Sequence, residues 1–208
     1  SDVYKRQLYN YTEGYGSYLI PAVMMIIIFQ TLLMVIGMVT GEEYSSDGIR
    51  TYAPFGHTWA AAIRIVAGKT FVYCGLYAIF SFFLLGLLPY FFSIPNIGNG
   101  LYIVLLMIPY LIATSFLGLA ASRYFTDSEA PLLMIAFFSV GLIFLSGVSY
   151  PMELMPWYWK ATHYILPAAP ATLAFVQLNS MGASMADIRP EYITLWIQVP
   201  VSYTHLTL

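Results

Sequence analysis

The chain has 208 residues, of which 60% are hydrophobic and 9% are charged. This composition leaves too little polar surface to cover a soluble globule, so it excludes an ordinary water-soluble domain. The formal net charge of −2 gives no indication of a nucleic-acid partner. The single cysteine, Cys74, lies in an apolar block and indicates no redox compartment.

Two long uncharged blocks predict membrane-spanning helices. No charged residue occurs from Gly14 to Gly41, and none occurs from Thr70 to Ser122. Each block exceeds the roughly 20 residues that cross a bilayer core as a helix, and the second is so long that it must fold back once. We therefore predict an all-α polytopic membrane protein with four complete spans and the start of a fifth, at about residues 18–40, 70–92, 101–122, 130–149 and 192–200.

The connection between the first two spans contains a short helical pattern at residues 57–67. Trp59, Ile63 and Val66 share one face of this helix, and His57 and Arg64 lie on the opposite face. The segment is too short and too polar to cross a membrane. It is expected to lie along the membrane interface or to dock on a partner.

Residues 150–186 differ in character from the spans before them. Two Trp residues lie near the front, two amides and a serine lie behind, and four prolines interrupt the stretch: Pro151, Pro156, Pro167 and Pro170. A straight span is therefore excluded, and we predict short helices at the membrane face that dip back into the bilayer. The Trp and Tyr side chains suit the headgroup level.

The two ends of the chain are expected to be foreign to the protein. The stretches SDVYKRQ and VSYTHLTL resemble peptides that recur at the tips of translated metagenomic fragments. Residues 1–7 and 201–208 are therefore set aside, and residues 8–200 are taken as a fragment of one membrane domain.

Basic residues in the connections predict the orientation of the spans. The connections at 42–69 and 123–129 carry four of them, and the other side carries only Lys160 and Arg189. Because loops rich in Lys and Arg stay in the cytoplasm, the first pair of connections is expected to be cytoplasmic. The four residues are Arg50, Arg64, Lys69 and Arg123.

The stretch RIVAGKT at residues 64–70 ends like a phosphate-binding loop but does not fit one. The position that requires the first glycine of that loop is Ile63, and an apolar span follows Thr70 instead of a nucleotide-domain helix. The histidines lack ligand spacing and the spans contain no paired acids. We therefore expect no catalytic, cofactor or metal site in this chain.

Polar and small residues inside the spans are the remaining candidates. Gln30 falls near the middle of the first span, where its amide either lines a translocation path or makes an interhelical hydrogen bond. Small residues recur at every fourth position in two spans, and such patterns permit close helix approach within the chain. These residues are Gly37 and Gly41 in the first span and Thr114, Gly118 and Ser122 in the third.

Three stretches resemble known sequence motifs. They are Tyr9-Asn10 followed by YLIP at 18–21, then Glu42-Glu43 with Gly48 and a helix ending in Gly68-Lys69, and finally LSGVSYPMELMP at 145–156. Together they are similar to the second-span lead-in, the cytoplasmic segment and the outer turn of type-2 ATP-binding-cassette (ABC) exporter permeases. The sequence departs from that pattern at Tyr11 and Ile49, where the family has Pro and Thr.

The resemblance implies the second to sixth spans of an ABC exporter permease that works by alternating access. Residues 42–69 would be the cytoplasmic coupling segment, although a solvated span end remains an alternative for its acids. Residues 150–186 would form the outer gate. The implied coupling residues are Glu42, Glu43, Gly48, His57, Trp59, Arg64 and Lys69, and the implied gate residues are Gly147, Pro151, Glu153 and Pro156.

The same resemblance implies the partners and the location. ATP and Mg²⁺ would be bound by a separate ABC ATP-binding subunit, and this chain would bind no cofactor and have no ATPase site. A second permease copy, the lipid bilayer and a periplasmic adaptor would be further partners, in a bacterial cytoplasmic (inner) membrane. Substrates of such exporters include drugs, lipids and glycans, among which the sequence does not choose.

Two other function classes remain open from the sequence. A membrane-embedded enzyme of lipid or cell-wall metabolism would need acids or histidines inside the spans or at the interface. A passive channel or scaffold would lack a cytoplasmic element coupled to conformational change.

Overall fold

The computed structural model describes residues 16–45, 59–92, 96–122, 124, 129, 131–132, 141–150 and 152–207. Within these ranges the chain is helical and contains no strand. The long helices are α1 (Gly16–Ser45), α2 (Trp59–Ser81), α4 (Gly100–Ser122) and α8 (Arg189–Thr207). The shorter elements are the π-helix η3 (Phe82–Leu87), α3 (Leu88–Phe91), the 3-10 turn η4 (Met152–Leu154), α6 (Trp157–Ile165) and α7 (Ala168–Met181).

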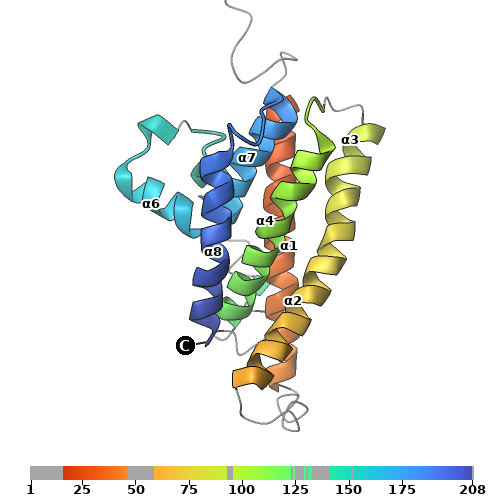
Figure 1. Cartoon of the computed structure of the whole chain (residues 1–208), viewed down its shortest axis with the longest axis vertical. Coiled ribbons are helices and arrows are strands. Elements are labelled where there is room, and N and C mark those ends of the chain that lie inside the picture. The colour runs from red at the N-terminus through yellow and green to blue at the C-terminus, as the bar shows by residue number, and fades with distance from the viewer. Residues whose placement is uncertain are drawn as a thin grey trace, which may run out of the picture.

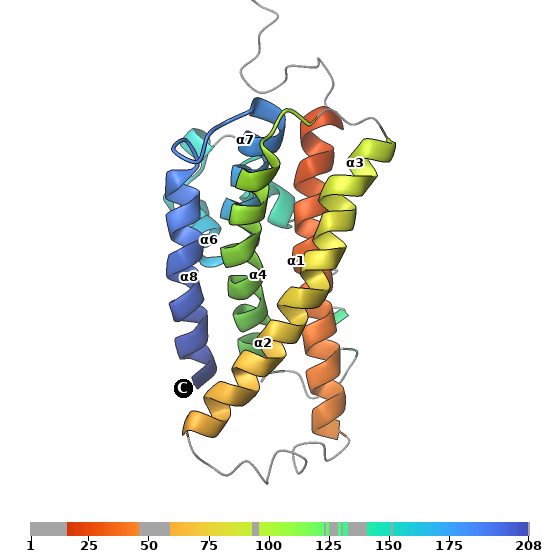
Figure 2. The same cartoon turned by 45° about the vertical axis from the view of Figure 1, so that its right-hand side comes forward.

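The long helices stand side by side in one bundle (Figure 1). α4 lies at the centre and packs against α1, α2, α7 and α8. α1 ends and α2 begins at the bottom of Figures 1 and 2, which we call the proximal end. α4 and α8 both begin at the top, which we call the distal end.

Three helices are long and apolar enough to cross a membrane, among the residues that the structure describes. They are Tyr18–Glu43, Ile63–Phe91 and Gly100–Ser122. The first three predicted spans are therefore confirmed as long apolar helices. In the predicted fourth span, 130–149, residues 130 and 133–140 lie outside the described residues, so its continuity stays a prediction, and the fifth lies within α8.

The coupling helix predicted at 57–67 is not separate from the span that follows it. α2 runs without a break from Trp59 through Lys69 to Ser81, and the chain continues as η3 and α3. The greater polarity toward residue 59 does not end the helix. Gly68 does not end it either, because a single glycine is tolerated inside a helix.

The π-helix η3 has a local cause in the sequence. Pro89 follows it, and in a regular α-helix its ring would clash with the carbonyl of Leu85, four residues earlier. The wider turn of η3 ends two residues before this proline, and the amide of Leu88 donates to the carbonyl of Phe83. The helix thus continues past the proline with an altered register.

The core is formed where α4 crosses α1. A Cβ added to Gly118 would lie 2.9 Å from Ile36 Cδ1 and 3.1 Å from Leu33 Cδ2, so any larger residue would force these side chains to shift. Nearer the distal end, the hydroxyl of the fully buried Tyr110 donates to the carbonyl of Met25 at 2.8 Å. The small-residue pattern predicted for close helix approach is thus confirmed at Gly118.

Candidate functional site

The proximal end brings together the charged residues that flank the first connection. Glu42 and Glu43 lie in the last turn of α1, and Arg64 and Lys69 lie in the first three turns of α2. Lys69 forms an ion pair with Glu43 Oε2, with both side chains about a quarter exposed. Glu42 and Arg64 are exposed. This pair links two helices whose contact elsewhere is slight.

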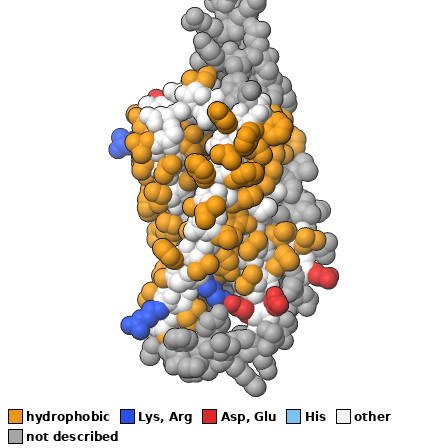
Figure 3. Space-filling model, turned by 90° about the vertical axis from the view of Figure 1, so that its right-hand side faces the viewer, with side chains coloured by type: hydrophobic (Ala, Val, Ile, Leu, Met, Phe, Trp, Pro, Cys, Tyr) orange, Lys and Arg blue, Asp and Glu red, His pale blue; other side chains and the backbone are white. Residues whose placement is uncertain are grey.

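The charges at the proximal end border a broad apolar surface. Figure 3 looks onto the side of the molecule where α2 and α3 lie, and hydrophobic side chains cover it above a group of acidic and basic ones. Such a boundary is where a bilayer would meet water, because charged groups are costly in the hydrocarbon core. Lys69 can keep its stem in the apolar region while its ammonium group is paired.

The structure covers the predicted coupling residues only in part. Glu42, Glu43, Arg64 and Lys69 lie at one end of the molecule, and Trp59 is the first residue of α2. Gly48 and His57 lie outside the described residues. The role of all these residues in coupling stays a prediction.

At the predicted outer gate, Gly147 occupies a conformation that glycine favours. Its φ is +81°, and a Cβ at this position would lie 2.9 Å from Met152 Cγ. The chain then turns through η4 to Pro156, which precedes α6. Pro151 lies outside the described residues, and Glu153 is the middle residue of η4. Short helices therefore follow Gly147 as predicted, and the span predicted before it stays a prediction.

Two hydrogen bonds hold α6 against its neighbours. His163, which is 1% exposed, donates from Nδ1 to the carbonyl of Leu145 at 2.8 Å. Burial lowers the pKa of His163, against the opposing effect of this bond, so the neutral ring is favoured, with its proton on Nδ1. Gln198 of α8 donates from Nε2 to the carbonyl of Tyr164 at 2.7 Å. The start of the gate region is thus fixed to two other elements.

α7 is buried among the long helices at the distal end. It packs against α1, α4 and α8, and Ala171, Ala174 and Phe175 on it are at most 1% exposed. The loop before α4 also docks on it, with Ile97 donating its amide to the carbonyl of Asn179 at 3.0 Å. A Cβ on Gly98 would lie 2.6 Å from the carbonyl oxygen of Leu178. The predicted re-entrant region therefore includes a helix that belongs to the core.

Gln30, the predicted path residue, is half-buried in α1. Its position neither supports the translocation path nor assigns its amide to an interhelical bond. Both readings stay predictions.

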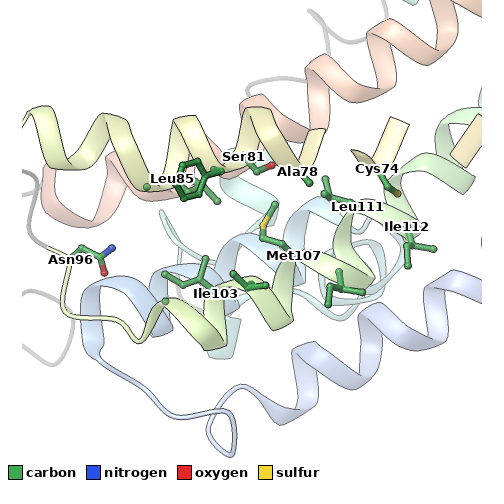
Figure 4. Close-up of a pocket in the computed structure, with 14 residues that line it drawn as sticks. Cys74, Ala78, Ser81, Leu85, Asn96, Ile103, Met107, Leu111 and Ile112 are labelled. Atoms are coloured by element: carbon green, nitrogen blue, oxygen red, sulfur yellow. The ribbon is translucent and has the colours of Figure 1, made fainter. Parts of the chain in front are cut away.

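A groove between α2 and α4 was not expected from the sequence. It has a volume of about 660 Å³ and is lined by the C-terminal half of α2, by η3 and by the N-terminal half of α4 (Figure 4). The sequence signals that contribute to it are the small residues Ala78 and Gly86 and the proline that follows η3. None of these alone predicts a cavity.

The whole chain was compared with known proteins. The family model described as ABC-2 family transporter protein matches residues 1–206. No match was found among curated proteins or among solved structures. The family match and the long apolar helices agree with the motif resemblance at residues 145–156. The chain therefore belongs to the ABC-2 family of transporter proteins, as a transmembrane permease.

Proposed function

We propose that this chain is the membrane subunit of an ABC exporter and that a separate ATPase subunit acts on its proximal end. The family match over residues 1–206 carries the proposal. It is supported by the three apolar helices and by the charged residues gathered where α1 ends and α2 begins. In this proposal the proximal end faces the cytoplasm, in keeping with the excess of Lys and Arg in residues 42–69.

The proposed coupling residues divide into two kinds. Glu42 and Arg64 are exposed at the proximal end. Glu43 and Lys69 join α1 to α2. Closure of the ATPase dimer would move the exposed groups, and the ion pair would pass that movement to both helices. Gly48, His57 and Trp59 are proposed to complete the contact surface.

The distal end is proposed to contain the exit. Residues 150–186 would gate it, with Gly147 and Pro156 setting the turn into α6 and Pro151 and Glu153 lying between them. A second permease copy would complete the path, to which Gln30 is proposed to contribute. Drugs, lipids and glycans all remain candidate substrates of such an exporter.

Co-purification tests this function. The protein would be expressed in membranes together with a candidate ABC ATPase from the same genome, and the complex would be isolated through a tag on the permease. We expect the ATPase to be retained and its rate of ATP hydrolysis to change on assembly. If the permease purifies alone and leaves the ATPase rate unaltered, the proposal is wrong, and an enzyme or a passive channel becomes the better explanation.

A matched pair of variants locates the contact. Arg64 and Arg189 are both exposed, at the proximal and distal ends respectively. Arg64→Glu is expected to weaken retention of the ATPase, and Arg189→Glu is expected to leave it unchanged. Equal retention in both variants would remove Arg64 from the coupling surface.

A further inference from the structure

The groove between α2 and α4 has the size of a ligand site and opens on the apolar side of the bundle. Its volume of about 660 Å³ lies within the roughly 300–1,000 Å³ range of small-molecule pockets. Both of its walls belong to helices that are long and apolar enough to cross a membrane, so acyl chains are the surroundings that we expect for it. It lies away from the proximal charges, and its role does not depend on the proposed coupling.

The walls of the groove are apolar along its length. Ala78 and Gly86 leave space on the α2 side, opposite the larger Ile103 and Met107 of α4 (Figure 4). Ser81 also lines the groove, but its hydroxyl oxygen is buried away from the open space. The surface offered to an occupant is therefore hydrocarbon, which suits an alkyl chain.

The length of the groove corresponds to one leaflet of a bilayer. On the α4 side it extends from Gly100, the first residue of the helix, to Ile112, which at 1.5 Å per residue is about 18 Å. The hydrocarbon core is about 30 Å thick, so one leaflet accounts for about 15 Å. A groove that starts at the distal end of a span and stops just past the midplane matches one acyl chain of that leaflet.

The distal end of the groove is polar, and the deep end is not. Asn96 stands at the distal end in Figure 4, with Cys74 and Ile112 at the other. Its Oδ1 accepts from the amide of Gly98 at 3.0 Å, and no described residue accepts from its Nδ2. Tyr90 is exposed toward the same end, as Tyr side chains are where a bilayer meets water. An amide donor at this depth suits an ester carbonyl or phosphate oxygen.

The π-helix η3 forms part of the wall. Phe82, Leu85 and Gly86, three of its six residues, line the groove. π-helical turns are rare and often occur at functional sites. The π-helical segment that continues α2 thus forms part of the groove wall.

We propose that this groove binds one acyl chain of a phospholipid from the leaflet at the distal end, with Asn96 donating a hydrogen bond to the lipid's ester or phosphate oxygen. The occupant comes from the bilayer and not from another protein segment. Its ordered chain would fill the space between α2 and α4.

Photo-crosslinking in vesicles tests the site. The full-length protein would be reconstituted in phosphatidylcholine that contains a trace of an analogue with a diazirine either near the ester or at the end of one acyl chain. Mass spectrometry would map the labelled residues. We expect the ester-proximal probe to label around Asn96 and Ile103, and the chain-terminal probe to label around Cys74 and Ile112.

Two glycines on the same helix provide the variant and its control. Gly86 lines the groove with only the Phe82 ring within 4 Å of an added Cβ, and Gly75 has nothing within 4 Å and does not line it. Gly86→Leu is expected to lower labelling of the groove about tenfold, and Gly75→Leu is expected to leave it unchanged. Ala78→Leu serves as a second filling variant should Gly86→Leu fail to fold.

Three results would overturn the proposal. The first is labelling of groove residues that does not depend on the position of the diazirine. The second is labelling that survives both filling variants. The third is labelling confined to residues outside the groove, which would show that lipid does not enter it.

Discussion

α4 and α2 are both long apolar helices, yet they are buried to different extents in the bundle. Of the most apolar 18-residue window in each, 56% is buried for α4 and 22% for the continuous helix Ile63–Phe91, which comprises most of α2 with η3 and α3. α4 contacts four helices, whereas α2 leaves Phe71 and Ile79 at least 75% exposed. α4 and α1 thus form the fixed core, and α2 is a peripheral helix joined to it at few places.

We infer from this difference in burial that the two helices have different roles, although their compositions are similar. α2 carries the ion pair at the proximal end and one wall of the groove toward the distal end. A helix held by few contacts can shift at little cost, because low local contact density accompanies low local stability. Variants that disturb α4 should therefore affect folding, and variants on α2 should affect function.

The largest expected effect comes from enlarging Gly118. Gly118→Leu would drive a side chain into Ile36 and Leu33, and overpacking of this kind costs about 1–3 kcal/mol. We expect a lower unfolding temperature and less folded protein. Both are measured on the detergent-solubilised protein, by thermal unfolding and by size-exclusion chromatography. Gly75→Leu on α2 is the control, with an open site and no expected loss. Equal losses in the two variants would contradict the division between α4 and α2.

A smaller effect is expected from Tyr110→Phe. The variant removes the hydrogen bond to the Met25 carbonyl but keeps the ring, and interhelical bonds in membrane proteins average about 0.6 kcal/mol with a maximum near 1.7. Tyr90→Phe is the matched control, because Tyr90 is 81% exposed at the distal end of α2's continuation. Thermal unfolding of both variants measures the difference. No loss in Tyr110→Phe would remove this bond from the core that fixes α1 to α4.

The smallest effect is expected where α2 meets α4. Cys74 Sγ lies 3.7 Å from Ser115 Oγ, which is a weak contact. Cys74→Ala should change the free energy of unfolding by less than about 0.5 kcal/mol. A loss as large as that of Tyr110→Phe would show that α2 is bound tightly, and the comparison between the two helices would fail.

The long helices could be predicted from the sequence because their signal is local. The absence of charge over more than 20 residues is enough to predict a span, as α1 and α4 illustrate. Helix ends were less predictable. The segment at 57–67 appears distinct because its polarity differs, but the backbone continues through Gly68, and polarity alone does not break a helix.

The contacts between helices could not be predicted from the sequence pattern. Glu43 and Lys69 were each candidates, but their pairing depends on how α1 and α2 meet across 26 residues of chain. The groove depends on η3, for which Pro89 is the only local signal, and on small residues that face α4 through packing. Periodicity cannot give such interhelical geometry, because it reports one helix at a time.

The central claim is that the proximal ion pair couples α1 and α2 to the ATPase, and a charge-swap cycle tests it most directly. ATP hydrolysis by the purified complex would be measured for Glu43→Lys, Lys69→Glu and the double variant, with each protein checked for retained ATPase. A partly exposed pair is worth about 0.2–1 kcal/mol, so each single reversal should lower the stimulated rate about 1.4- to fivefold. We expect the double variant to recover most of the loss. Unchanged rates in all three variants, or a double variant no better than the singles, would contradict it.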